Sequence, residues 1–422
     1  MKHITKIYAI ITILLTIVIV IPLLMSITVV KNKKDLDMYM NSYVKNDTYK
    51  NIHIYDSSCT PIYDKGFSDD EVIRKSMFHI VGDRYGSLPK SLLTENCDKE
   101  KNNNNKLFGY SPTDTVINLT IDLQLQKAAY LTLENSGYNG CIVVIDYLTG
   151  EIKAMVSFPT VDVYNTEYIQ DGAFLNKALL TYPPGSVFKA VTVAAALESN
   201  PSVKNYKYNC SGVQNHIVCH NKTVHGQVDL NKALEVSCNC AISNLAKMSL
   251  TPDMLDKYTE KFKLTSSDII ADMDIAKGSI DSSDDLMWAA NGQSKDMVSP
   301  ISMAMFYGAI ANNGIIRQLK IKQDTDNLAT EQIISSSTAS TLTEAMTSLC
   351  RDAGIRCAAF GKTGTAQLDL SESHAWFVCS LVDKNAPTYA IVTFLEQGGK
   401  SYVAKKITAT YINNYVLNGI GT

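Results

Sequence analysis

The sequence lacks an excess of positive charge. Its 39 lysines and arginines are outnumbered by 42 aspartates and glutamates, which gives a net charge of -3 over 422 residues. Proteins that bind nucleic acid neutralise phosphates with clustered basic residues, so this balance argues against a nucleic-acid partner. No internal repeat stands out, which argues against a solenoid or propeller array. With 45% hydrophobic residues, the composition is that of an ordinary globular protein with ample material for a core.

Charge is missing altogether from one segment near the N-terminus. The run from Ile7 to Val30 contains 24 uncharged residues, long enough to span a bilayer even with Pro22 inside it. No clear small-residue cleavage site follows, so a cleaved signal peptide is the weaker interpretation. We therefore expect a transmembrane anchor at residues 7–30. Lysines flank the run on both sides, so the positive-inside rule alone does not set its orientation.

Long apolar runs are also missing from residues 31–114, which are polar and irregular. Short alternations at Ile52–Tyr55 and Pro61–Tyr63 predict small strands. The stretch from Asp98 to Lys106 has no apolar residue to bury, which predicts a solvated loop or linker. We expect residues 31–114 to form a compact pedestal or stalk domain.

The strongest chemical signal is a serine followed three residues later by a lysine. Ser186 and Lys189 lie at the start of an apolar helical run, where this spacing brings the hydroxyl and the amine onto one face. Two prolines and Gly185 end the preceding segment, which leaves Ser186 at a helix N-terminus that favours an oxyanion. A second Ser-x-x-Lys, Ser87–Lys90, contains Pro89 and precedes no long apolar helix, so we interpret it as a loop. Ser186 is therefore the candidate nucleophile.

Two further motifs follow in order along the chain. They are Ser237-Cys238-Asn239 and Lys362-Thr363-Gly364-Thr365. Taken singly, the serine and asparagine are compatible with helix-cap or turn roles, and the lysine with a solvated strand charge. Together with Ser186 and Lys189 they form the trio found in penicillin-binding proteins and class A β-lactamases.

The resemblance extends over residues 115–420, and the chain resembles a class B penicillin-binding protein, a monofunctional peptidoglycan D,D-transpeptidase. Similar segments occur in matching order at Leu119–Gln126, at the expected hairpin from Cys141 to Phe158, at His225-Gly226, at Gly292-Gln293 and at Ser299-Pro300. The resemblance implies a transpeptidase domain at residues 115–422, outside the membrane, and a cytoplasmic N-terminus at residues 1–6. We see no glycosyltransferase-like region and no C-terminal repeat domain.

The resemblance also implies a role for each motif residue. Ser186 attacks the D-Ala-D-Ala carbonyl of a stem peptide, and Lys189 is the base if burial or a neighbouring cation lowers its pKa. Ser237 relays a proton to the departing D-Ala, and Asn239 binds the substrate amide. The terminal carboxylate meets Lys362, Thr363 and Thr365, and Gly364 lets the substrate backbone approach. The backbone N–H groups of residues 186 and 365 would form the oxyanion hole.

The partners that this resemblance implies are peptidoglycan stem peptides, β-lactams as covalent inhibitors, a membrane glycan polymerase and other wall-synthesis proteins. No cofactor is expected. Three alternatives stay open: a membrane-anchored D,D-carboxypeptidase, a serine β-lactamase, and a non-catalytic β-lactam sensor or scaffold. A β-lactamase needs a deacylating base, and no Glu-x-x-Leu-Asn type segment lies between the second and third motifs.

The order of predicted elements indicates an α+β fold. Strands are expected near residues 141–146, 151–157, 357–367, 374–383 and 388–395, and a last helix near 401–417. Thr251-Pro252 and Ser299-Pro300 each place an N-cap residue before a proline at the first helical position. Strands at both ends of the domain with helices between them predict one antiparallel sheet packed by helices.

The ten cysteines suggest two disulfides and little else. Cys210 with Cys219, and Cys350 with Cys357, are the two pairs expected if the domain is exported. Cys210, Cys219, His216, His220 and His225 lie close together in the sequence, but their spacing fits no zinc template. No metal is therefore expected from spacing alone.

Overall fold

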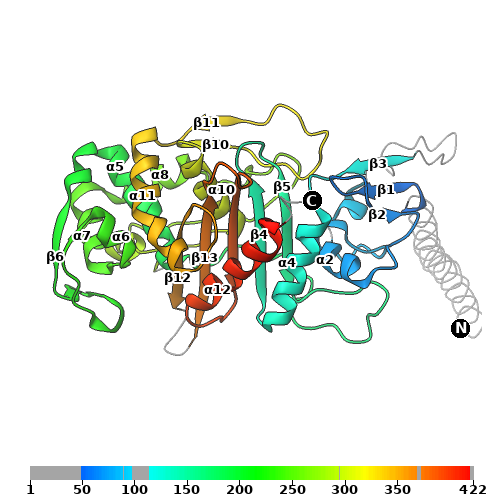
Figure 1. The fold of residues 1–422 in the computed structure, drawn as a ribbon, viewed down its shortest axis with the longest axis horizontal. Coiled ribbons are helices and arrows are strands. Elements are labelled where there is room, and N and C mark those ends of the chain that lie inside the picture. Colours follow the sequence, from blue (N-terminus) through cyan, green and yellow to red (C-terminus); the bar gives the residue numbers. More distant parts are fainter. Residues whose placement is uncertain (1–48, 89, 97–113, 294, 368–371, 419–422) are drawn as a thin grey trace, which may run out of the picture.

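A computed structural model describes residues 49–88, 90–96, 114–293, 295–367 and 372–418. The expected anchor at 7–30, the N-terminus at 1–6 and the loop at 98–106 lie outside these ranges. Within these ranges, no helix combines the length and the apolar character needed to cross a membrane. Figure 1 shows three parts along the long axis: a small sheet near the N-terminus, a larger central sheet, and a mainly helical lobe.

The central sheet has five strands, and every neighbouring pair is antiparallel. Its order is β12 (Ala359–Gln367), β13 (Ser373–Leu381), β14 (Tyr389–Leu395), β4 (Gly140–Asp146) and β5 (Ile152–Phe158). The pairing of β14 with β4 joins the C-terminal strands to the N-terminal hairpin. The predicted strands and the α+β arrangement are confirmed, and β12 is left as an edge strand.

Helices cover both faces of this sheet. On one face lie α4 (Leu123–Ser136) and α12 (Tyr402–Tyr411), the latter continued by a π-helical turn at Ile412–Val416. On the other lies α10 (Pro300–Ala311), which is apolar all round and buried along almost its whole length, as a helix between layers should be. The predicted caps are confirmed: Ser299 accepts from the Ser302 N–H, and Thr251 caps α8 (Pro252–Lys261).

The helical lobe carries the expected nucleophile and the second motif. Its helices are α5 (Lys189–Ser199), α6 (Leu230–Glu235), α7 (Asn239–Ser249), α8, α9 (Leu286–Ala289) and α11 (Ser336–Asp352). Two short hairpins extend between α5 and α6. In these, β6 (Lys207–Cys210) pairs with β9 (Gly226–Asp229), and β7 (Val213–Gln214) pairs with β8 (Ile217–Val218). Beyond α10, β10 (Ile315–Arg317) pairs with β11 (Thr330–Gln332).

The small sheet contains β1 (Ile52–Tyr55), β2 (Pro61–Asp64) and β3 (Thr115–Asn118), with α2 (Glu71–Val81) beside it. The two short strands predicted here are confirmed. Strand β3 pairs in parallel with β1. The sheet therefore combines strands from the predicted pedestal, residues 31–114, with a strand from the predicted transpeptidase domain, residues 115–422. A two-point ion pair between Arg74 of α2 and Asp162, with N–O distances of 2.7 and 2.8 Å, ties this part to the larger domain.

Candidate active site

Ser186 lies in a 3₁₀ turn, Gly185–Phe188, that leads directly into α5. Gly185 has φ of +56°, a conformation that side chains disfavour, and its N–H donates to the Gly292 carbonyl at 2.8 Å. A Cβ at Gly185 would lie 2.7 Å from the Thr365 carbonyl oxygen of β12. The turn that carries the serine is therefore pressed against the strand that carries the third motif.

The Lys189 amine is the centre of a hydrogen-bond network. Its Nζ lies 2.7 Å from Ser186 Oγ, 3.0 Å from Ser237 Oγ and 2.6 Å from Asn239 Oδ1. The side chain is fully buried, and this burial lowers the pKa of Lys189 to about 7, although nearby cysteines act in the opposite direction. A large fraction of this amine is uncharged at neutral pH, so it can accept the serine proton.

Ser237 lies in the turn between α6 and α7, and Asn239 is the first residue of α7. Ser237 has φ of +54°, which is uncommon for a residue other than glycine. Cys238 is the N-cap of α7, and its sulfur accepts from the Ala241 N–H at 3.4 Å. The Asn239 amide donates to the Val218 carbonyl at 2.8 Å, which turns its Oδ1 toward Lys189. Both motif side chains therefore face the amine from a fixed backbone.

Lys362 is not a solvated strand charge. It is fully buried, and its Nζ donates to Ser237 Oγ at 3.0 Å and to the Thr363 carbonyl at 3.2 Å. Burial, followed by the charge of Lys189, lowers the pKa of Lys362 well below its usual value. The hydroxyl of Ser237 thus lies between two amines, at 3.0 Å from each.

The rest of the third motif lies on β12 beside the serine turn. Thr363 and Thr365 are half-buried. A Cβ at Gly364 would come within 2.8 Å of the Pro184 carbonyl oxygen and 3.0 Å of Val187. Gly364 was expected to let a substrate backbone approach. The missing Cβ makes room for the serine turn, and the approach of a substrate backbone to this residue stays a prediction.

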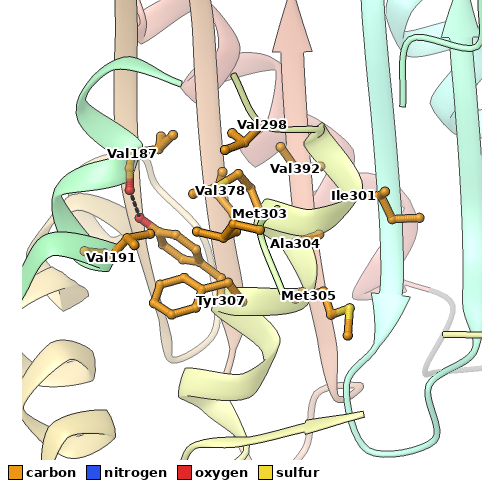
Figure 2. Close-up of a cluster of buried hydrophobic side chains, with 14 of the residues drawn as sticks. Val187, Val191, Val298, Ile301, Met303, Ala304, Met305, Tyr307, Val378 and Val392 are labelled. Carbon is orange, nitrogen blue, oxygen red and sulfur yellow. Dashed lines mark hydrogen bonds between the residues drawn. The ribbon is translucent and has the colours of Figure 1, made fainter. Parts of the chain in front are cut away.

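A rigid core supports the serine turn from behind. Figure 2 shows Val187 and Val191 packed with α10 and with Val378 and Val392 of the sheet, and the Tyr307 hydroxyl donating to the Val187 carbonyl at 3.0 Å. On the other side of the turn, the Trp376 indole N–H donates to the Pro183 carbonyl at 3.0 Å. Neither contact was predicted from the sequence. The signal for Tyr307 was a hydroxyl within a mainly apolar helix, since a buried tyrosine hydroxyl needs a partner.

The structure therefore brings Ser186, Lys189, Ser237, Asn239 and Lys362 into one network, and places Thr363, Gly364 and Thr365 next to it on the same strand. No ion pair links either lysine to a carboxylate of the described chain. The second Ser-x-x-Lys is a loop, as expected, at its described residues.

The predicted disulfides are not formed. Every described cysteine is a free thiol. Cys350 contacts the thiol of Cys379, while the sulfurs of Cys210 and Cys219 are 3.7 Å apart. Cys219 is instead part of a group with Cys210, His225 and Cys238 whose ligand atoms all lie within 4.8 Å of one another. Cys238 belongs to both this group and the Ser-x-Asn motif.

Comparison with known proteins agrees with this geometry. Among curated sequences, the peptidoglycan D,D-transpeptidase PbpA of Mycolicibacterium smegmatis is 26% identical over 345 residues, which is 69% of each chain. The peptidoglycan D,D-transpeptidase FtsI of Escherichia coli is 24% identical over 313 residues, covering 67% of this chain and 52% of that one.

Solved structures share the fold. Penicillin-binding protein A of M. tuberculosis, as its ceftriaxone acyl-enzyme complex, superposes with a TM-score of 0.71 at 20% identity, covering 88% of this chain and 100% of that one. The D,D-transpeptidase domain of a peptidoglycan glycosyltransferase from Eggerthella lenta gives 0.71 at 23% identity, with coverage of 87% and 98%.

The family model described as the penicillin-binding protein transpeptidase domain matches residues 140–416. This match contains all three motifs and the whole five-stranded sheet. The chain belongs to the penicillin-binding protein transpeptidase family, and within it to the class B penicillin-binding proteins.

Proposed function

We propose that this chain is a peptidoglycan D,D-transpeptidase that works through an acyl-enzyme on Ser186. One observation carries the proposal: a fully buried amine, with its pKa lowered to about 7, lies 2.7 Å from the hydroxyl of Ser186. Such a pair converts a resting serine into a nucleophile at neutral pH.

In the first step, Ser186 Oγ attacks the carbonyl of the penultimate D-Ala while Lys189 takes the hydroxyl proton. The backbone N–H groups of Ser186 and Thr365 stabilise the oxyanion. The C–N bond to the terminal D-Ala then breaks, and the proton passes from Lys189 through Ser237 to the departing nitrogen. The 2.7 and 3.0 Å distances from Lys189 Nζ to the two hydroxyls suit this transfer.

Substrate binding uses Lys362, the second buried lysine of the hydrogen-bond network. A terminal carboxylate near Lys362 favours the charged form of this amine, which burial and Lys189 otherwise disfavour. Thr363 and Thr365 offer hydroxyls to the same carboxylate. Because β12 is an edge strand, an extended stem peptide can align along it. Asn239 accepts from Lys189 through its side-chain oxygen and donates to the Val218 carbonyl through its amide, and the second N–H of this amide is the proposed donor to the substrate.

In the second step, the amine of another stem peptide attacks the ester carbonyl. Lys189 accepts the amine proton and returns it to Ser186 Oγ, so the C–O bond breaks, the peptide crosslink forms and the free enzyme is restored. A carboxypeptidase would use water as the acceptor instead. A β-lactamase needs a base for deacylation, and no Glu-x-x-Leu-Asn type segment lies between the second and third motifs.

The test combines penicillin labelling with a crosslinking assay. The full chain should label covalently with fluorescent penicillin, and Ser186→Ala should abolish the label. Ser87→Ala, in the exposed second Ser-x-x-Lys, is the matched control and should label normally. Labelling that survives Ser186→Ala would refute the assignment. With polymerised lipid-linked muropeptide as substrate, crosslinked product supports the transpeptidase, whereas D-Ala release without crosslinks indicates a carboxypeptidase.

We also propose that residues 7–30 anchor the chain in the cell membrane as a single span, with residues 1–6 cytoplasmic, residues 31–114 as a pedestal and the domain at 115–422 extracellular. The uncharged 24-residue run supports this arrangement. A membrane glycan polymerase is the proposed partner. A chain from a structure titled as a peptidoglycan synthase complex that coordinates polymerisation and crosslinking is similar to this one, with a TM-score of 0.65. Extraction of the protein from membranes by carbonate alone would contradict the anchor.

A further inference from the structure

Three cysteines and a histidine converge at the hairpin end of the helical lobe. Cys210 ends β6, Cys219 precedes the short turn at His220–Lys222, His225 precedes β9, and Cys238 caps α7. Figure 1 shows β6 and α7 side by side at the end of the molecule farthest from the N-terminus. The three cysteines are 0–2% exposed, and His225 is half-buried. These elements enclose a space that four potential metal ligands share.

The distances between these atoms match a tetrahedral metal site. Zinc bonds of about 2.3 Å to sulfur and about 2.0 Å to nitrogen place two sulfurs about 3.8 Å apart, and a sulfur and a nitrogen about 3.6 Å apart. The Cys210–Cys219 and Cys219–Cys238 sulfur distances are both 3.7 Å, and Cys210 Sγ lies 3.5 Å from His225 Nδ1. All four ligand atoms lie within 4.8 Å of one another.

The arrangement differs from that of a disulfide. A disulfide would bring one pair of sulfurs to about 2.05 Å and leave the others apart. Cys219 instead has the sulfurs of Cys210, Cys238 and Cys240 at 3.7, 3.7 and 3.5 Å. Within the proposed ligand group, the sulfurs of Cys210 and Cys238 are equally distant from Cys219, as expected around a shared ion, whereas Cys240 lies beside the group.

Backbone donors around the sulfurs favour their thiolate forms. The Gly212 N–H donates to Cys210 at 3.3 Å, and the Ala241 N–H donates to Cys238 at 3.4 Å. Metal-bound thiolates commonly accept outer hydrogen bonds of this kind. Buried thiolates also require positive charge nearby, which a divalent cation would supply.

We propose that Cys210, Cys219, His225 and Cys238 bind one Zn²⁺ in a tetrahedral structural site. Three thiolates and an imidazole select zinc over the harder divalent cations. The protein fills all four positions, so no place remains for a substrate or a reactive water. Binding displaces the thiol protons of the three cysteines into solvent, and no other bond changes.

The site would hold the second catalytic motif in place. Cys238 lies between Ser237 and Asn239, so a metal bond to its sulfur fixes the turn from which both residues face Lys189. Ser237 has a backbone conformation that costs free energy and needs support from its surroundings. Zinc would therefore support catalysis by holding this turn in position.

The first test uses the unchanged full chain, purified without chelator and without added metal. Elemental mass spectrometry should find about one zinc per chain. After exchange, Co²⁺ should give the visible bands of a tetrahedral ion and a thiolate-to-cobalt band in the near ultraviolet. Absence of bound zinc together with failure to take up cobalt would overturn the proposal. So would a Cys210–Cys219 disulfide found by non-reducing peptide mapping of freshly purified protein.

Variants then test the ligand set. Cys219→Ala should lose most of its zinc, and its thermal midpoint should no longer respond to a strong chelator. Cys141→Ala, which removes an equally buried thiol from β4, should keep both properties. Cys240→Ala is the sharper control, because Cys240 is outside the group of four, and it too should retain zinc. Equal zinc in the Cys219 and Cys141 variants would refute this site.

The metal measurements do not depend on the catalytic proposal. Zinc content and cobalt spectra are read without substrate, so a chain that binds zinc but fails to label with penicillin would refute the function and leave the site intact. A chain that labels normally with penicillin but holds no metal would refute the zinc site and leave the proposed function intact.

Discussion

Two buried polar clusters meet at residues 237–239, and they differ in how their members are arranged along the chain. The amine cluster joins Lys189 and Lys362 to the hydroxyls of Ser186 and Ser237. The thiol cluster joins Cys210, Cys219, His225 and Cys238. The first is built from three short motifs, each with a recognisable spacing. The second is spread over two hairpins and a helix cap, and only the fold brings it together.

The clusters also have opposite electrostatic character. Burial lowers the pKa of both lysines, so each amine is pushed toward its neutral form. The nearby cysteines, Cys238 first, act on Lys189 in the opposite sense and raise its pKa. The amine cluster would perform the chemistry, while the thiol cluster would position Ser237 and Asn239. Variants that act on one cluster and spare the other test this division.

Among the variants that act on one cluster and spare the other, Lys189→Ala should have the largest effect. Removing a general base typically slows the chemical step by about 10²- to 10⁴-fold, so acylation by fluorescent penicillin should slow by that order. Zinc content should be unchanged, because Lys189 is outside the thiol cluster. Lys90→Ala, from the exposed second Ser-x-x-Lys, is the control and should acylate at the parent rate. A Lys189→Ala protein that acylates normally would remove the base from the mechanism.

The pH dependence of acylation should follow Lys189. Its pKa is lowered to about 7, and only the neutral amine can accept the serine proton. Below this value the amine is protonated, so the acylation rate constant should fall by about tenfold per pH unit, and above it the rate should level off. Stopped-flow measurements between about pH 5.5 and 8.5 would give the profile, and Lys189→Ala should flatten it. A rate that falls as the pH rises from 5.5 to 7.5 would have the wrong sign for this base.

The smallest effect is expected behind the serine turn. Tyr307→Phe removes the hydroxyl that donates to the Val187 carbonyl at 3.0 Å. The free energy of unfolding should fall by about 1–3 kcal/mol, because a buried carbonyl loses its partner. Urea denaturation would measure this change, and Tyr402→Phe, at a tyrosine that is 60% exposed, is the control. Equal stability of the two variants would mean that the core does not hold the turn through this bond.

Local patterns predicted much of the fold and of the amine cluster. The strands of the central sheet read as apolar runs, and Ser299-Pro300 marked the start of α10 as helix caps do. The serine and its lysine are one helical turn apart, so their contact follows from local geometry.

Contacts between distant segments could not be predicted in the same way. The sequence did not predict that the missing Cβ of Gly364 makes room for Pro184, which lies far away in the sequence. The thiol cluster could not be predicted from the sequence for a similar reason. Zinc templates rely on close pairs of ligands, whereas here Cys238 joins from a helix cap beyond β9, and His225 replaces the two other histidines that looked equally suitable.

The central claim is that Ser186 is the residue acylated, with Lys189 as its base. The most direct measurement is peptide mapping by mass spectrometry of the full chain after brief exposure to benzylpenicillin. We expect a single penicilloyl adduct on the peptide that contains Ser186, formed more slowly at pH 5.5 than at pH 8. An adduct on Ser87 or Ser237, or an unmodified chain under conditions in which the protein is folded, would contradict it.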